Sequence, residues 1–119
     1  MIEGVKITPL KQFSDERGKV MHMLKSSDLN FKKFGEIYFS SINPGAVKDW
    51  HQQKVSTINY AVPSGQIKLI LYDDRLESPT QGEIQELTLG IDNYCLVTIP
   101  PMVWSGFKCH GSETALLAN

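Results

Sequence analysis

Apolar residues recur at every second position through much of the second half of the chain. The clearest run has Ile67, Leu69 and Leu71 on one face, and it ends at the charged Asp73–Arg75 segment. A period of two is that of a β-strand with one buried face. The pattern predicts a strand here, followed by an exposed connection that includes Asp73–Arg75 and Ser78–Gly82.

Other β-rich runs are bounded by glycine, proline, asparagine or aspartate. The expected strands cover residues 36–42, 57–62, 84–89, 94–99 and 114–118. Residues 26–33 are the one stretch expected to form a helical turn, with Ser27 as its cap. Strands at roughly 8–12-residue spacing are typical of a sandwich or barrel, and a jelly roll suits this pattern best. We expect one all-β, cupin-like jelly-roll domain over residues 1–119, with a pocket inside it.

Composition narrows the possible partners. The 119 residues carry 12 basic and 13 acidic side chains, for a net charge of -1. This balance predicts no nucleic-acid or anionic-membrane partner. The N-terminus lacks a signal-peptide pattern, and no run approaches the roughly 18 apolar residues of a membrane span. Cys95 and Cys109 are expected as reduced, buried thiols, and the expected location is cytoplasmic.

The richest candidate chemistry lies in the segment Lys48–Lys54. His51 is suited to act as a general base near neutral pH, and Lys48 could stabilise an anionic intermediate. Regular strand alternation places these two side chains on opposite faces, so only a bend or bulge would bring them together. The alternative is a surface patch with an incidental histidine.

A metal site is not expected at His51. Gly45 and His51 match the opening of the metal-cupin ligand pattern G-x5-H-x-H, but Gln53 stands where the second histidine belongs. The later histidine is also missing, whereas catalytic metals take about three or more protein ligands. We therefore predict no catalytic metal. His22 and His110 are isolated and are expected on the surface.

Two further segments each have two interpretations. Asp15–Gly18 is either a polar turn or the carrier of Arg17, whose guanidinium suits phosphate oxygens. Pro100–Phe107 is a rigid turn leading into an aromatic strand. In it, Trp104 and Phe107 are either core residues or a stacking platform for a ligand.

Taken together and in order, five segments resemble the dTDP-4-dehydrorhamnose 3,5-epimerase family, particularly its short members. They are Asp15–Gly18, Gly35–Ser40, Pro44–His51, Leu71–Arg75 with Ser78–Thr80, and Ile99–Phe107. The resemblance covers nearly the whole chain. It implies a metal-free, cofactor-free, cupin-like jelly roll. Members of this family remove a proton beside the ketone of a nucleotide-linked 4-keto-6-deoxysugar and reprotonate the enolate on the opposite face.

The resemblance also implies roles for individual residues. His51 matches the general base, and Lys48 matches a basic residue near it. Arg17 matches an arginine that binds the nucleotide diphosphate, and in a homodimer it would reach the partner's pocket. Glu36 stands where the family often has a glutamine facing the ligand. The remaining substrate-binding candidates are Gln53, Lys54 and Trp104.

Two departures from the family leave alternatives open. No tyrosine stands near residues 116–119, where the family has its acid, and the chain stops at Asn119 before the aspartate that orients the histidine. Either a C-terminal segment of the family is lacking, or activity is lost and the domain is a non-catalytic binder of sugar nucleotides or carbohydrates. Tyr38, Tyr60 and Tyr72 are substitute acids only if they face the interior.

Two other activities also remain possible. Related sugar-nucleotide 3,4-ketoisomerases carry His-x-His-Lys at this strand, and the segment His51–Lys54 lacks only the second histidine. A metal-dependent cupin is the weaker of the two.

Overall fold

The computed structural model describes residues 1–119 and consists of β-strands joined by turns and loops. Its strands are β1 (Lys6–Pro9), β2 (Gln12–Asp15), β3 (Gly18–Met21), β4 (Phe39–Ile42), β5 (Val47–Gln52), β6 (Ile58–Ser64), β7 (Gln66–Tyr72), β8 (Ile84–Gly90), β9 (Cys95–Ile99), β10 (Trp104–Cys109) and β11 (Ala115–Ala118). The structure contains no helical segment with the length and apolar character of a membrane span.

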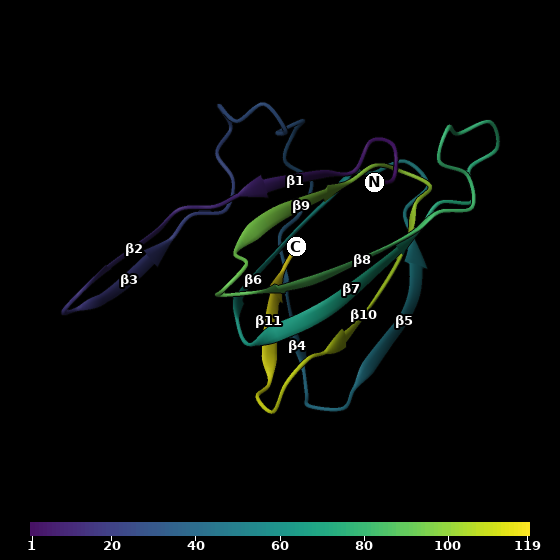
Figure 1. Ribbon diagram of the computed structural model, residues 1–119. Helices are drawn as coiled ribbons and strands as arrows, with labels where there is room; N and C mark the ends of the chain where they lie inside the picture. Colours follow the sequence, from purple (N-terminus) through teal and green to yellow (C-terminus); the bar gives the residue numbers. More distant parts are fainter.

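The strands form two sheets that face each other, together with a separate hairpin (Figure 1). The first sheet has the order β1-β9-β6-β11-β4, and the second has the order β5-β10-β7-β8. The expected all-β sandwich is therefore confirmed. β4 and β5 follow one another in the chain, yet they lie at the edges of different sheets.

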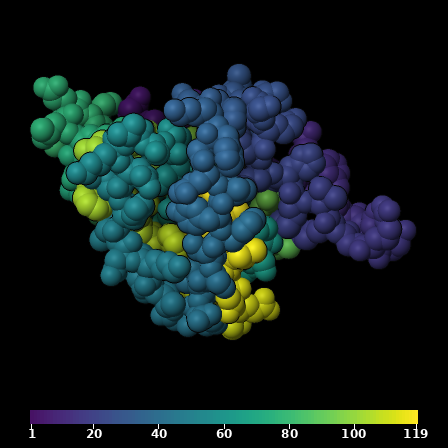
Figure 2. All heavy atoms as spheres, turned by 180° about the vertical axis from the view of Figure 1, so that it is seen from behind, coloured from purple at the N-terminus to yellow at the C-terminus, as the bar shows by residue number.

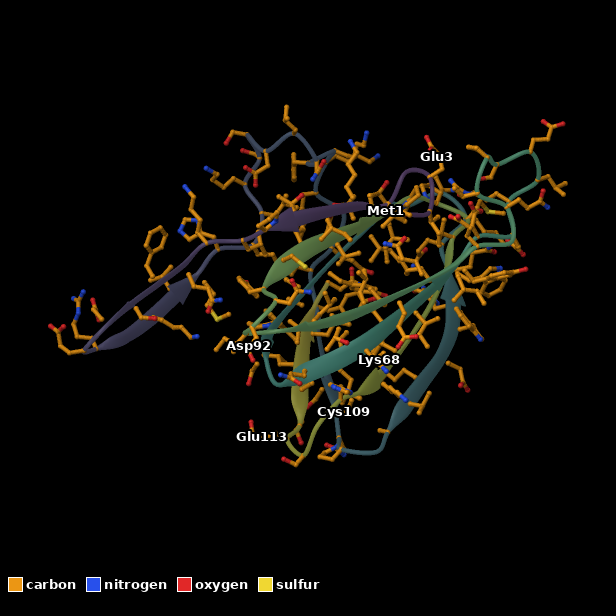
Figure 3. All side chains as sticks on the ribbon, viewed as in Figure 1. Met1, Glu3, Lys68, Asp92, Cys109 and Glu113 are labelled. Atoms are coloured by element: carbon orange, nitrogen blue, oxygen red, sulfur yellow. The ribbon has the colours of Figure 1, made fainter.

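The core lies between the two sheets and follows the alternation of the sequence. Ile67, Leu69 and Leu71 of β7 are fully buried, and Val97 and Ile99 of β9 meet them from the other sheet in one apolar cluster. Burying one such side chain contributes roughly 1.5–3 kcal/mol. The alternate positions of β7 point outward, among them Lys68, which Figure 3 labels. Lys68 pairs with Glu86 at 2.8 Å. Cys95 and Cys109 are buried free thiols, as expected.

The segment after β3 covers part of the outer face of the first sheet. Ala61, Tyr94 and Leu96 form a small second cluster there, against which Met21 and Met23 pack. The following segment contains turns where a helical turn was expected over residues 26–33, and that prediction was wrong. The physical reason is local: the Asp28 carboxylate accepts a hydrogen bond from the Lys25 backbone N–H at 2.8 Å, which closes a turn instead.

The connection after β7 also differs from expectation. Asp73 is fully buried, although the segment was predicted to be an exposed connection. Its carboxylate accepts five hydrogen bonds, from the Arg75 backbone, Arg75 Nε, Arg75 Nη2, Ser78 Oγ and Thr80 Oγ1. Arg75 also donates to the Glu3 carbonyl oxygen, and Thr80 Oγ1 accepts from the Glu3 N–H. The loop is thus fastened to the N-terminus, where Figure 3 labels Glu3.

The β2–β3 hairpin projects from the sandwich as an arm (Figure 1). Asp15 and Gly18 close the hairpin, as the polar-turn interpretation of this segment predicts. Phe13 and Val20 are cross-strand partners on this arm, and they remain 55% and 59% exposed. A two-stranded hairpin is only marginally stable alone. This arm also lacks the core packing that stabilises the strands of the two sheets.

Candidate active site

A partly open cavity of about 230 Å³ lies between the two sheets, at the edge where β4 and β5 run. Both sheets contribute to its walls. From the first sheet come Tyr38, Ser40, Tyr60, Leu117 and Asn119; from the second come Lys48, Asp49, His51 and Phe107. Figure 2 shows the yellow C-terminal residues reaching the surface beside the blue segment that contains β4.

A register shift in the second sheet brings Lys48 and His51 onto one face. Along the pairing of β10 with β5, Ser105 lies opposite His51, while Phe107 lies opposite Lys48. The two positions on β10 are therefore two residues apart, whereas their partners on β5 are three residues apart. Because cross-strand partners share a face of the sheet, both polar side chains point inward, as their partners Ser105 and Phe107 do. The structure thus contains the bulge that is needed to bring Lys48 and His51 together.

His51 has a polar neighbour just past the end of β5. Its Nε2 lies 3.0 Å from Nε2 of the Gln53 amide. With the amide in this orientation, Gln53 donates and Nε2 accepts, so the imidazole proton sits on Nδ1. With the amide reversed, its oxygen would accept from Nε2–H. In either arrangement, Gln53 fixes the orientation of the ring.

On the opposite wall, Tyr38 and Asn119 form a closely bonded pair. Their backbones exchange two hydrogen bonds, of 3.0 and 2.9 Å, which extend the β4–β11 ladder by one residue. In addition, Asn119 Nδ2 donates to the Tyr38 hydroxyl oxygen at 2.6 Å. Both side chains follow the inward alternation of their strands, set by buried Ile42 on β4 and Leu117 on β11.

Tyr60 forms the deeper part of the same wall. It is 4% exposed and meets Phe107 edge-on, with ring centroids 6.0 Å apart. Burial raises the pKa of Tyr60; the Ser105 hydroxyl partly offsets this rise, and Tyr38 adds to it. Ser105 Oγ is itself buried without a hydrogen bond of ordinary geometry.

The structure gathers some of the predicted site residues and separates others. Lys48 and His51 line the cavity, and Gln53 contacts His51. The remaining candidates lie outside the cavity wall, and their roles in substrate binding stay predictions. Glu36 is exposed ahead of β4, Lys54 is exposed after β5, Trp104 faces outward and donates to Asp74 at 3.1 Å, and Arg17 lies at the tip of the arm.

Among the three tyrosines considered as acids, two face the cavity. Tyr38 and Tyr60 line it, whereas Tyr72 lies on the outward face against Trp50. Ser40, Asp49 and Asn119 are cavity residues that the sequence did not single out. Ser40 and Asn119 could have been found from the sequence. Each lies two residues from an apolar residue, Ile42 or Leu117, and alternate residues of a strand share a face.

The donor set around His51 does not suit a metal ion. No group of three or more histidine, cysteine, aspartate or glutamate side chains converges anywhere in the structure. The closest partner of His51 is the neutral amide of Gln53. Besides the single carboxylate of Asp49, the cavity therefore offers a base, a cation and two phenols.

Comparison with known proteins agrees with this picture. The sequence profile of the dTDP-4-dehydrorhamnose 3,5-epimerase family matches residues 1–118. The probable low-salt glycan biosynthesis epimerase Agl13 of Haloferax volcanii is 36% identical over 120 residues, which cover 99% of this chain and 77% of that protein.

Two solved structures share the fold. The crystal structure of a dTDP sugar isomerase from Desulfovibrio desulfuricans has a TM-score of 0.97 and 46% identity, covering 99% of this chain and 76% of the other. The dTDP-6-deoxy-D-glucose-3,5-epimerase RmlC of Legionella pneumophila, solved with dTDP-4-keto-L-rhamnose, has a TM-score of 0.83 and 26% identity. The match to RmlC covers 98% of this chain and 65% of that one.

The fold and the cavity thus define a cupin-like β-sandwich enzyme of the isomerase class, a sugar-nucleotide epimerase. The chain belongs to the dTDP-4-dehydrorhamnose 3,5-epimerase family.

Proposed function

We propose that the cavity epimerises a nucleotide-linked 4-keto-6-deoxysugar, with His51 as the general base and Lys48 as the cation that stabilises the enolate. The observation that carries this proposal is the register shift of β5, which turns both side chains into one cavity of this family's fold. The substrate class is supported by the keto-sugar nucleotide bound to the Legionella relative.

The chemistry requires little beyond these two groups. A ketone acidifies the hydrogen on the adjacent carbon, because removal of that hydrogen places the negative charge on oxygen. An imidazole within the cavity takes the proton, and a nearby ammonium group stabilises the oxyanion that develops. The Gln53 contact holds the imidazole in one orientation while this happens.

Proton NMR in D2O tests the proposal, with dTDP-4-keto-6-deoxyglucose as the probe. We expect the wild-type protein to exchange the C3 or C5 proton for solvent deuterium, so that its signal disappears. His51→Asn should slow that exchange by roughly 10²–10⁴-fold. His110→Asn is the matched control, because His110 is exposed and lies outside the cavity. Unchanged exchange in His51→Asn would remove His51 from the mechanism. Saturable broadening of the ligand signals with no exchange by the wild type would indicate a binding protein instead.

The assembly is a second part of this proposal. We propose a homodimer in which the arm packs against a second copy and Arg17 serves the partner's cavity as a phosphate contact. Two features support it: the exposed Phe13 and Val20 on the arm, and the position of Arg17 at its tip. The Asp15 carboxylate lies 2.7 Å from the Arg17 guanidinium, and this ion pair orients the guanidinium. Light scattering that shows a monomer at working concentration would contradict this assembly.

The cytoplasmic location expected from the sequence belongs to the same proposal. It is supported by the two free cysteines, because reduced thiols are typical of the cytoplasm. Cell fractionation with an antibody against the protein would test it.

A further inference from the structure

We propose that Tyr38 delivers the proton that completes inversion, and that Asn119 is the positioning residue for its hydroxyl group. This inference rests on the proposed function and concerns the second half of the reaction. The observation behind it is that the phenol and the base stand on opposite walls of one cavity.

Opposite walls matter because of the geometry of an enolate. Its reacting carbon is flat, and inversion requires the proton to leave from one face and return to the other. His51 projects from β5 in the four-stranded sheet, whereas Tyr38 extends β4 in the five-stranded sheet. A planar intermediate lying between the sheets therefore shows one face to the imidazole and the other to the phenol.

Tyr38 suits this task better than the other proton donors of the cavity. Tyr60 is 4% exposed, and burial raises its pKa, so it holds its proton and is remote from water. Tyr38 is 43% exposed, so solvent can restore its proton after each turnover. Lys48 projects from the same wall as His51 and would return the proton to the face it left.

Asn119 prepares the Tyr38 oxygen for the loss of its proton. The 2.6 Å hydrogen bond runs from Asn119 Nδ2 to the hydroxyl oxygen, so the phenolic hydrogen is not used in that contact. It remains free to point at the ligand. A donor aimed at the oxygen also stabilises the phenolate that forms when the proton departs.

The step balances without an oxidant, reductant or further reactant. His51 takes the proton from the carbon beside the ketone, and the C–H electron pair forms the C=C bond of the enolate. The Tyr38 O–H bond then breaks as a new C–H bond forms on the opposite face, and the carbonyl re-forms. The imidazolium loses one proton to water and the phenolate regains one, which restores both groups.

Two rates measured in the same D2O experiment test the assignment: loss of the substrate C–H signal and formation of the inverted sugar. We expect Tyr38→Phe to exchange within about threefold of the wild-type rate, because His51 can return a solvent deuteron to the original face. Formation of the inverted product should fall by roughly 10²–10⁴-fold. Asn119→Ala should lower the ratio of inversion to exchange in the same direction, by about tenfold. Tyr72→Phe, which alters an outward-facing tyrosine, is the matched control.

The outcomes separate the two proposals. Suppose that the wild type catalyses both exchange and inversion, and that Tyr38→Phe does so at the same rates. This result would overturn the role of Tyr38 and leave the epimerase assignment intact. Loss of both exchange and inversion in Tyr38→Phe would also overturn it, since that result places Tyr38 in binding or folding. An unchanged ratio in Asn119→Ala would remove Asn119 alone. A wild-type protein that exchanges nothing would contradict the proposed function itself.

Discussion

At the scale of single residues, the contact between His51 and Gln53 decides how the base is presented. An amide offers a donor and an acceptor, so it can partner either neutral tautomer of imidazole. It adds no charge to the cavity, unlike a carboxylate in the same place. The sequence alone led us to expect Gln53 as a substrate-binding residue, and the 3.0 Å contact gives it a second possible role, that of orienting His51.

Kinetics can distinguish these two roles of Gln53. If Gln53 orients the base, Gln53→Leu should lower kcat by about tenfold and leave KM nearly unchanged. Gln52→Leu is the matched control, because the neighbouring Gln52 amide donates to the Met102 carbonyl oxygen and not to His51. A raised KM with an unchanged kcat would instead favour the substrate-binding role.

The register shift shows what residue patterns cannot reveal. Alternation along Lys48–His51 correctly describes an ideal strand, and it placed the two side chains on opposite faces. The actual arrangement depends on pairing with Ser105 and Phe107, more than fifty residues away in the chain. The register between two strands cannot be read from one of them alone. The sequence therefore identified Lys48 and His51 as candidates but could not predict that they lie on one face.

At the scale of elements, the loop after β7 is organised by a buried charge. Arg75 lowers the pKa of Asp73 most strongly, and the Thr80 and Ser78 hydroxyls lower it further, although burial acts in the opposite direction. The strand itself was predictable from its period of two. The buried carboxylate was not, because charged residues at a strand end usually reach solvent and its partner Arg75 is anchored by the distant Glu3.

Replacing this carboxylate should weaken the fold in a pH-dependent way. We expect Asp73→Asn to lower the free energy of unfolding by about 3 kcal/mol at neutral pH, since it leaves Arg75 without its anionic partner. The folded-state pKa of Asp73 is depressed, so its contribution is complete above the unfolded pKa of about 4 and is lost as the pH falls further.

Urea unfolding at a series of pH values measures this effect. The gap between wild type and Asp73→Asn should stay constant from about pH 8 to about pH 5 and should narrow below about pH 4. Asp74→Asn, at the exposed neighbouring position, should change stability by less than about 0.5 kcal/mol. A gap that widens as the pH falls would contradict the burial and pairing described for Asp73.

At the scale of the whole molecule, the arm and the cavity lie apart within one protomer. Residues Asp15–Gly18 were expected to be either a turn or a phosphate-binding element, and the structure shows the turn at the tip of a projecting hairpin. The sandwich could be predicted from strand number and spacing. The projection of the arm could not, since nothing local distinguishes a hairpin that packs on its own body from one that reaches outward.

Mixing two damaged variants tests whether Arg17 acts on a second copy. We expect Arg17→Ala and His51→Asn each to be nearly inactive at low substrate concentration. Mixed dimers should regain one complete cavity from His51 of one copy and Arg17 of the other. With equal amounts and free exchange of subunits, roughly a quarter of the wild-type activity should return. No recovery, with mixed dimers demonstrated by mass spectrometry, would place Arg17 outside the partner's cavity.

The path of the chain between β4 and β5 has a consequence for protein engineering. One continuous stretch, residues 38–53, crosses from one sheet to the other and carries the proposed acid, cation and base together with the amide that orients the base. The other strands serve mainly as a frame that holds the two ends of this stretch apart. Exchanging this single cassette with that of another family member should therefore transplant most of the reactive groups in one step, and the remaining barrier to new specificity would lie in the few wall residues outside it.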